Sequence, residues 1–242
     1  ITIYRTFVGN YMTSIDMAGA SVSLLALDDE LKTYLDAKAN TPAFKMDGSA
    51  AQPIQLATDD VKAEDLFNVA IETHAEHASI LNNQFSLENM RYVVDAMSAC
   101  IIKNEIPFCE LDAHAGDGDF GMSVAKGFKQ LKREWNTLLQ CQQMDDFLLN
   151  CSMIIMEHCG GASGPIWGSA FRSASKSVQG KSTLSVTDFA DMLQAAVKGI
   201  QITGERSFGR GAVVGDKTLI DALVPCADSW SANSDKTFKE NF

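Results

Sequence analysis

Hydrophobic residues recur at intervals of three and four from about residue 60 to the end of the chain. Residues 86–104 show this best, since one helical face would carry Leu87, Met90, Val94, Met97 and Ile101. Ser86 precedes this segment as a candidate cap. The same spacing recurs over 145–158, 187–200 and 219–230. The pattern predicts a bundle of antiparallel amphipathic helices.

The N-terminal part has a different pattern. Residues 1–8 alternate as in a strand, residues 20–27 resemble a second strand, and a short helix is expected from Asp28. Residues 40–60 are rich in proline, glycine and small polar residues, which is typical of a linker. Two strands and a helix are too few for an independent domain, so we expect their sheet partners upstream or in another chain.

These patterns together predict a mainly α fold, an antiparallel helical bundle preceded by a small α/β remnant. The expected organisation is an N-terminal remnant over 1–40, a linker and connecting helix over 41–85, and a helical domain over 86–242.

Composition narrows the classes of protein. The net charge of −11 argues against nucleic acid or anionic membrane as a partner, because neither would find a basic patch. The six cysteines contain no C-x-x-C pair, so reduced thiols are expected rather than a disulfide framework or a zinc site. No apolar run approaches the length of a membrane span and no signal peptide opens the sequence, which predicts a cytoplasmic protein.

The chemistry is concentrated in an acidic loop. Asp112, Asp117 and Asp119 lie within a segment that also holds three glycines. Glycine permits a tight turn, and Mg²⁺ prefers oxygen ligands that it often shares with substrate phosphates. An EF-hand that begins at Asp117 is excluded, because its required glycine and glutamate are replaced by Met122 and Phe128. The open alternatives are a metal site and a solvated acidic loop.

Two further segments accompany this loop. Residues 160–168 form a glycine-rich turn before an expected helix, where backbone amides would suit phosphate oxygens; close helix packing is the alternative. Residues 215–225 place Asp216 as a candidate N-cap before an amphipathic run. The chain contains neither a Walker-type loop nor a G-x-G-x-x-G motif.

The three segments, in this order, resemble the nucleotide-binding (L) domain of the dihydroxyacetone (glycerone) kinases. The family pattern is Leu-Asp-x4-Gly-Asp-Gly-Asp-His-Gly, then Gly-Gly-x-Ser-Gly, then Gly-Asp-Lys-Thr-Met-x-Asp-Ala-Leu. The corresponding segments here are 111–121, 160–164 and 215–223, and the resemblance covers about residues 86–233. Residues 8–21 resemble the end of the substrate-binding (K) domain, an order found in the ATP-dependent, single-chain enzymes.

The resemblance implies a helical barrel whose loops hold ATP or ADP with two Mg²⁺ ions. It assigns Asp112, Asp117 and Asp119 to the metal ions. It assigns the nucleotide to the remaining matched positions, which are Phe120, Gly121, Ser123, Gly161, Ala162, Ser163, Arg210, Gly211 and Leu219. Leu219 replaces a family methionine that contacts adenine, and this exchange keeps the apolar contact.

The sequence departs from the family in three ways. Phe120 replaces a histidine, which removes a polar contact to phosphate. The family's closing arginine segment is missing before Phe242. The covalent substrate histidine is expected in the K domain before residue 1, and none of this chain's four histidines lies in a matching motif. We therefore expect no catalytic residue in this chain and no turnover by the chain alone.

The implied function is phosphoryl transfer from ATP to dihydroxyacetone, glyceraldehyde or another short ketose, in glycerol metabolism, by a homodimer. Dihydroxyacetone would be held by a K domain outside this chain. The alternatives are an ADP-binding L subunit of a phosphotransferase system, a non-catalytic regulator, and a relative that cyclises FAD or phosphorylates fatty acids. The K-like segment over 1–40 argues against the separate L subunit.

Overall fold

The structure is a computed structural model in which the chain divides into two units, Ile1–Leu66 and Phe67–Phe242. Each unit is described by itself. The residues described are 2–9, 22–42, 44–49, 51–55, 70–114, 116–208 and 211–241.

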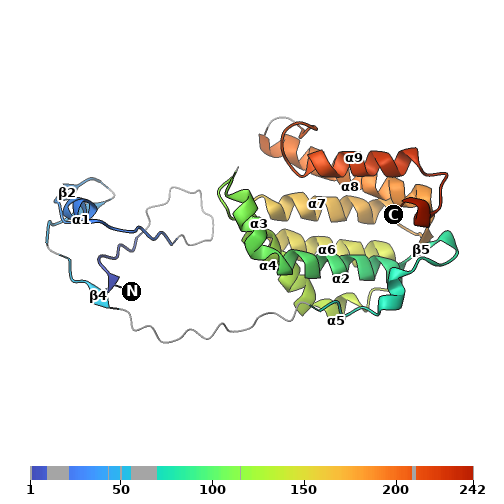
Figure 1. The fold of residues 1–242 in the computed structure, drawn as a ribbon, viewed down its shortest axis with the longest axis horizontal. Coiled ribbons are helices and arrows are strands. Elements are labelled where there is room, and N and C mark those ends of the chain that lie inside the picture. The colour runs from blue at the N-terminus through green and yellow to red at the C-terminus, as the bar shows by residue number, and fades with distance from the viewer. Residues whose placement is uncertain are drawn as a thin grey trace. The chain divides into compact units, whose positions relative to one another are not determined.

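The described residues of the N-terminal unit form one short helix and four two-residue strands (Figure 1). Its elements are β1 (Thr2–Ile3), α1 (Asp29–Leu35), β2 (Ala39–Asn40), β3 (Lys45–Met46) and β4 (Ile54–Gln55). β1 pairs with β4 and β2 with β3, both antiparallel. The predicted start of the helix is confirmed, because the Asp28 side chain accepts a hydrogen bond from the amide of Leu31 at 2.8 Å. No described residue of this unit is buried.

The two strands predicted for this part need correction. Only Thr2–Ile3 of the first expected strand pairs, and the described residues 22–27 of the second form no strand. Leu24 is 93% exposed there, and without a neighbouring strand its backbone gains no ladder hydrogen bonds. Within the linker expected over 40–60, the described residues include β3 and β4. The described residues 70–84 contain the 3₁₀ turns η1 (Ala75–Ala78) and η2 (Leu81–Asn83), and residues 56–69 of the expected connecting segment lie outside the described residues.

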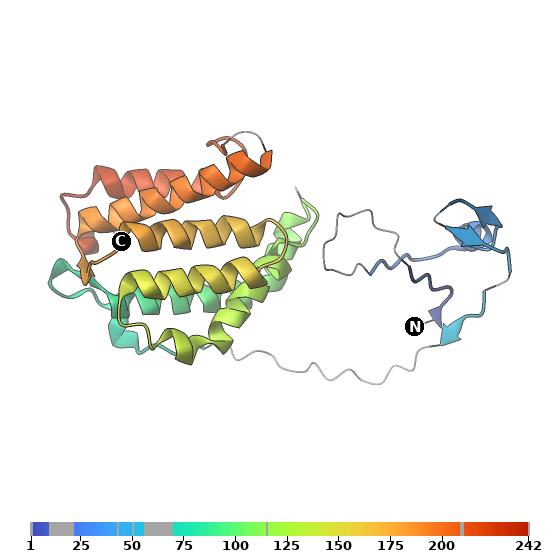
Figure 2. The same ribbon diagram turned by 180° about the vertical axis from the view of Figure 1, so that it is seen from behind.

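The second unit is an antiparallel bundle of amphipathic helices, seen from opposite sides in Figures 1 and 2. In chain order, α6 packs on α7, α7 on α8 and α8 on α9, while α4 packs on α2, α3 and α6. β5 and β6 form a short antiparallel pair. The predicted mainly α fold is confirmed. The elements are β5 (Phe85–Ser86), α2 (Leu87–Lys103), α3 (Glu105–Asp112), α4 (Phe120–Arg133), α5 (Trp135–Leu138), α6 (Met144–His158), α7 (Ser163–Ser177), β6 (Thr183–Leu184), α8 (Val186–Phe208), α9 (Ile220–Ala232) and α10 (Phe238–Asn241).

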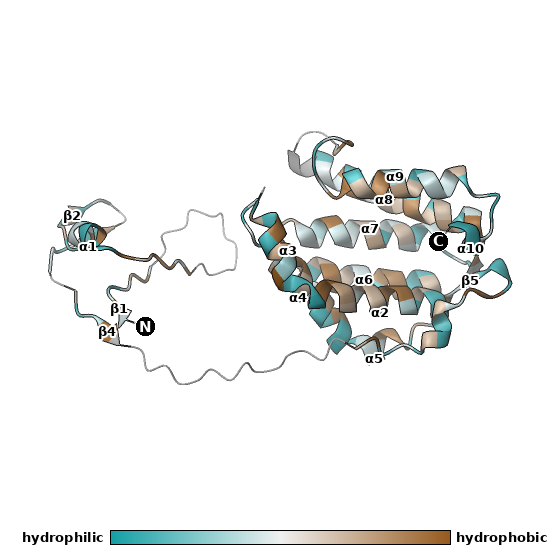
Figure 3. Cartoon of the chain, in the orientation of Figure 1, coloured by the Kyte–Doolittle hydropathy of each residue, from teal (hydrophilic) through white to brown (hydrophobic). Residues whose placement is uncertain are grey.

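Local sequence explains why these helices begin where they do and which face they bury. At the start of α2, the hydroxyl of Ser86 accepts from the amide of Asn89 at 3.3 Å, and the Asn89 side-chain oxygen accepts from the amide of Ser86 at 2.9 Å. This reciprocal pair is a capping box. Hydrophobic and hydrophilic residues alternate around the helices in Figure 3. On α4, Phe128 and Leu131 are 0% exposed, and each such burial contributes roughly 1.5–3 kcal/mol.

The antiparallel order brings three loops to one end of the bundle, where α3 joins α4, α6 joins α7 and α8 joins α9 (Figures 1 and 2). These loops contain the three motifs of the sequence. No helix among the described residues is long and apolar enough to span a bilayer.

A buried ion pair attaches residues 70–73 to the bundle. Asp95 of α2 is 0% exposed, and one of its carboxylate oxygens lies 2.6 Å from the ammonium group of Lys132 on α4. Its other oxygen accepts from the amides of Glu72 and Thr73 at 2.8 Å each, and from the Thr73 hydroxyl. The Lys132 ammonium group also donates to the Ala70 carbonyl at 3.0 Å. Both charges are thus paired and hydrogen-bonded, as buried charges must be.

Candidate functional site

The loop between α3 and α4, the aspartate loop (residues 112–121), is organised by its own first carboxylate. One oxygen of Asp112, the last residue of α3, accepts from the amides of Gly118 at 3.0 Å and Phe120 at 3.2 Å. The chain reverses at Gly118, whose φ of +78° favours glycine. A side chain at Gly116 would overlap the other carboxylate oxygen of Asp112. The loop therefore keeps this second oxygen accessible.

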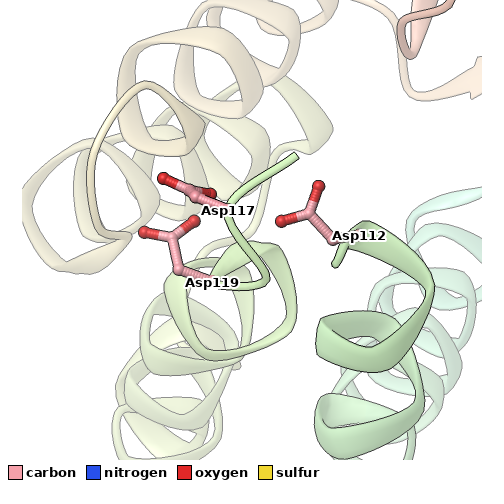
Figure 4. A group of neighbouring side chains, drawn as sticks. All are labelled: Asp112, Asp117 and Asp119. Atoms are coloured by element: carbon pink, nitrogen blue, oxygen red, sulfur yellow. The ribbon is translucent and has the colours of Figure 1, made fainter. Parts of the chain in front are cut away.

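The structure brings Asp112, Asp117 and Asp119 together at one point. One carboxylate oxygen from each lies within 4.8 Å of the other two, and Figure 4 shows Asp112 facing Asp117 and Asp119 across the turn. No lysine or arginine among the described residues forms an ion pair with any of them. Three carboxylates at this spacing repel one another, and a cation between them would relieve the repulsion.

The donor set fits Mg²⁺. Mg²⁺ binds oxygen at about 2.0–2.1 Å, so two ligands of one ion lie at most about 4.2 Å apart. The observed spread of up to 4.8 Å therefore suits either a slightly contracted single site or two ions about 3.5–4 Å apart.

Gly121 allows the two helices that carry these aspartates to approach each other. A Cβ at this position would overlap the carbonyl oxygen of Glu105 and lie 2.9 Å from the amide nitrogen of Cys109, both on α3. The Cys109 sulfur also accepts from the amide of Met122 at 3.3 Å. Gly121 was assigned to the nucleotide by resemblance, and the structure gives it a packing role that places Asp119 beside Asp112.

Phe120 and Ser123 both lie in the first turn of α4. The Phe120 ring is 37% exposed and its centroid lies 6.1 Å from that of Phe108. The Ser123 hydroxyl donates to the Asp119 carboxylate at 3.3 Å, and the Ser123 carbonyl accepts from the amide of Gly160 at 2.9 Å. This last bond joins the first turn of α4, which directly follows the aspartate loop, to the glycine-rich turn.

The glycine-rich turn (residues 160–164) presents backbone to solvent at the start of α7. Gly161 has φ +52° and open space around its Cβ position, and Ala162 precedes the first helical residue, Ser163. No hydrogen bond from the amides of Gly161 and Ala162 occurs within the described part of the chain. Gly164 packs closely, since a Cβ there would lie 2.9 Å from the Met156 carbonyl oxygen. Free amides at a helix N-terminus suit an anion.

In the third motif, the residue that caps the start of α9 differs from the predicted one. The predicted N-cap Asp216 is wrong, because α9 begins at Ile220 with Leu219 as its N-cap. The carboxylate of Asp221 instead accepts from the amides of Gly215 at 2.6 Å and Thr218 at 2.8 Å. Sequence reasoning missed Asp221, although Thr218-Leu-Ile-Asp221 carries the spacing of a capping box.

Leu219 connects the third motif with the second. Leu219 of the α8–α9 loop and Ile166 of α7 pack against the same cluster of buried residues, which includes Ala170 and Val197. Gly211 lies near the end of α8, its Cβ position 3.8 Å from the Gln201 carbonyl oxygen. Arg210 lies outside the described residues.

Two hollows in the N-terminal unit contain none of these motifs. They have volumes of about 280 and 590 Å³, and both are lined in part by Arg5. Neither contains a cluster of metal ligands, because the three aspartates form the one such cluster among the described residues. Donor groups rather than hollow volume decide where a cation binds, and the aspartates are the group among the described residues that could hold one.

Comparison with known proteins identifies the class. A DAK2 domain matches residues 114–242, which is more than half of the chain, and a Dak1 domain matches residues 1–43. The chain belongs to the DAK2 domain family.

Relatives with known names are kinases or kinase subunits. The chain is similar to the L-erythrulose 1-kinase of Mycolicibacterium smegmatis, with 34% identity over 94% of this chain and 38% of that protein. It is 29% identical to a probable dihydroxyacetone kinase of Dictyostelium discoideum, over 96% of this chain and 37% of that protein. It is 31% identical to the ADP-binding subunit DhaL of a PEP-dependent dihydroxyacetone kinase of Listeria innocua, over 55% of this chain and 60% of that subunit. The chain thus spans little more than a third of the first two relatives.

Proposed function

We propose that the helical unit binds Mg²⁺ and an adenine nucleotide between the aspartate loop and the glycine-rich turn. We further propose that it supports phosphoryl transfer from ATP to dihydroxyacetone or a related short ketose. The observation that carries this proposal is the convergence of three carboxylates within 4.8 Å at the start of α4, which the Ser123 carbonyl joins by a hydrogen bond to a turn with free amides.

Each part of the site has a defined task. The oxygens of Asp112, Asp117 and Asp119 hold Mg²⁺, which when bound neutralises charge on the phosphates. The amides of Gly161 and Ala162, with the Ser163 hydroxyl, receive phosphate oxygens. Phosphoryl transfer is helped mainly by positioning and charge neutralisation, so this set is sufficient for the donor side.

The acceptor side is assigned to Dak1 residues. No described residue of the helical unit is assigned as a base or as a covalent partner for a ketone. The names of the relatives, which include L-erythrulose and dihydroxyacetone, support a short polyhydroxy ketone as acceptor. A comparison of kcat/KM for these two ketoses, in a chain that joins this helical unit to a whole Dak1 domain, tests the substrate class. Equal inactivity with both would contradict it.

The central test is the dependence of nucleotide binding on the cation. Calorimetric titration of this chain with ATP should show binding with Mg²⁺ and none with EDTA, because a polyphosphate cannot approach three unneutralised carboxylates. The same titration with Ca²⁺, which prefers longer bonds and more ligands, serves as a control for charge alone. Binding of equal strength with EDTA would refute the assignment.

A second candidate is an ADP-binding subunit that retains its nucleotide and is recharged by a phosphoprotein. The observation that favours it is the similarity to the subunit DhaL. Gel filtration after loading with ADP separates the two candidates. A kinase that exchanges nucleotides at each turnover releases ADP on this timescale, whereas a subunit that keeps ADP as a cofactor elutes with it.

A further inference from the structure

The turn before α9 is built around an internal anion. The two carboxylate oxygens of Asp221 accept separately from the amides of Gly215, at 2.6 Å, and Thr218, at 2.8 Å. The hydrogen bonds from Thr218 and then Gly215 lower the pKa of Asp221, so it remains ionised near neutral pH. The amides of this turn, which would otherwise suit a phosphate, are therefore already occupied.

The backbone of the turn is held in conformations that it would not adopt alone. Gly215 has φ +107° and Lys217, which is not a glycine, has φ +58°. A non-glycine residue in the left-handed region costs free energy and persists only where surrounding contacts determine it. The two hydrogen bonds that the amides on either side of Lys217 donate to Asp221 are such contacts.

The turn decides where Leu219 lies. Leu219 is the next residue after Thr218 and the N-cap of α9, and it packs against the cluster shared with Ile166 near the start of α7. α7 begins at the glycine-rich turn. A change in the turn therefore moves Leu219 relative to the proposed phosphate site, while the aspartate loop and the glycine-rich turn keep their own hydrogen bonds.

We propose that Asp221 is a positioning residue, which fills the amide cradle of residues 215–218 and so fixes the base-binding side of the nucleotide site. With its amides occupied by Asp221, this turn has no free donor for a phosphate. This inference rests on the proposed function of the site, with Leu219 as the contact to the base, and adds Asp221 as the residue that positions this contact.

The test compares two ligands that share their phosphates. In Asp221→Asn, the side-chain amide keeps one oxygen that accepts a hydrogen bond and points an N–H group at the other backbone amide of the turn. The turn therefore loses one hydrogen bond and gains a repulsion between two N–H groups. Calorimetry should show about tenfold weaker binding of Mg-ATP, as expected for the loss of one charge-assisted hydrogen bond. Binding of Mg-tripolyphosphate, which has no base, should stay within about twofold of the unchanged chain.

Matched variants separate this effect from a general loss of stability. Asp228→Asn makes the same change on the exposed side of α9, where the Asp228 carboxylate accepts a hydrogen bond from Gln194 at 2.9 Å. This variant should change the binding of neither ligand. Gly215→Ala strains the backbone of the turn, and the added Cβ would meet no atom within 4 Å. This variant should therefore show the same selective loss of Mg-ATP binding as Asp221→Asn. Asp221→Glu keeps both oxygens and should recover part of the Mg-ATP affinity.

The outcomes are distinct. A selective loss of Mg-ATP in Asp221→Asn and Gly215→Ala supports the inference. An equal loss of both ligands, or no loss, overturns the role of Asp221 while the proposed function stands. Failure of the unchanged chain to bind either ligand would remove the proposed function, and the role of Asp221 with it.

Discussion

Asp95 and the aspartate loop show two ways in which this bundle uses carboxylates. Asp95 is completely buried, and its charge is matched by Lys132 and by the amides of Glu72 and Thr73. Asp117 and Asp119 are exposed, and they face each other and Asp112 without a cationic side chain among the described residues. The protein itself supplies all partners of Asp95, whereas the aspartates of the loop remain available for a cation.

The difference separates stability from function. A carboxylate that is fully hydrogen-bonded holds parts of the chain together and has no capacity for a ligand. Carboxylates that repel one another destabilise the loop in the absence of a cation. A bound cation removes this repulsion and stabilises the loop. The four predictions that follow test this contrast, from the largest expected effect to the smallest.

Removal of the buried charge should have the largest effect. Asp95→Ala leaves the Lys132 ammonium group buried beside only the half-exposed Glu72 carboxylate, at 2.9 Å, and the Ala70 carbonyl. Loss of one member of a buried pair costs about 3–5 kcal/mol of unfolding free energy. Urea unfolding measures this loss, and the exposed Asp228→Ala should stay within about 0.5 kcal/mol. A cost below about 1 kcal/mol would show that the pair is not important for stability.

Removal of an exposed carboxylate should weaken ligand binding without lowering the unfolding free energy. Asp117→Asn or Asp119→Asn should weaken Mg-ATP binding by at least about a hundredfold, which corresponds to about 2.7 kcal/mol. Without Mg²⁺, the unfolding free energy should be unchanged or slightly higher, because one repulsion is removed. Calorimetry and urea unfolding test the two halves, with the exposed Asp191→Asn on α8 as control. Unaltered Mg-ATP affinity would place the metal ions elsewhere.

Acid should affect the buried carboxylate in a defined pH range. Burial alone would raise the pKa of Asp95, but the hydrogen bonds from Lys132 and Thr73 outweigh it and hold the pKa below its ordinary value. Stability from this group is therefore fully present above the unfolded pKa of about 3.9 and is lost as pH falls through the lower folded value. The unfolding free energy of the unchanged chain should fall with pH below about 4 more steeply than that of Asp95→Asn. Parallel curves would contradict the lowered pKa.

The smallest effect concerns the ring beside the aspartates. Phe120→His places a donor where the related kinases have one, and should tighten Mg-ATP binding by about 0.5–1.5 kcal/mol, typical of one hydrogen bond. Calorimetry at a pH above the histidine pKa limits any contribution from charge. No gain would mean that the contact between Phe120 and Phe108, at 6.1 Å, organises the loop in this protein.

Much of the helical unit could be predicted from the chain alone, because its signals are local. The three- and four-residue spacing and the cap at Ser86 identify α2, and the glycine-rich turn predicts the start of α7. The three motifs were also sufficient to indicate the family. Each of these features depends on neighbours within one or two helical turns, so periodicity and capping rules apply directly.

The tertiary structure decided everything that joins distant segments. It paired Asp95 with Lys132, joined Ser123 to Gly160, and assigned Gly121 to the crossing of α3 and α4. It also left the described residues 22–27 without a strand. The physical reason is that a carboxylate or a strand gains its free energy from partners that packing brings to it. The sequence determined which groups were available, and only the fold determined which of them meet.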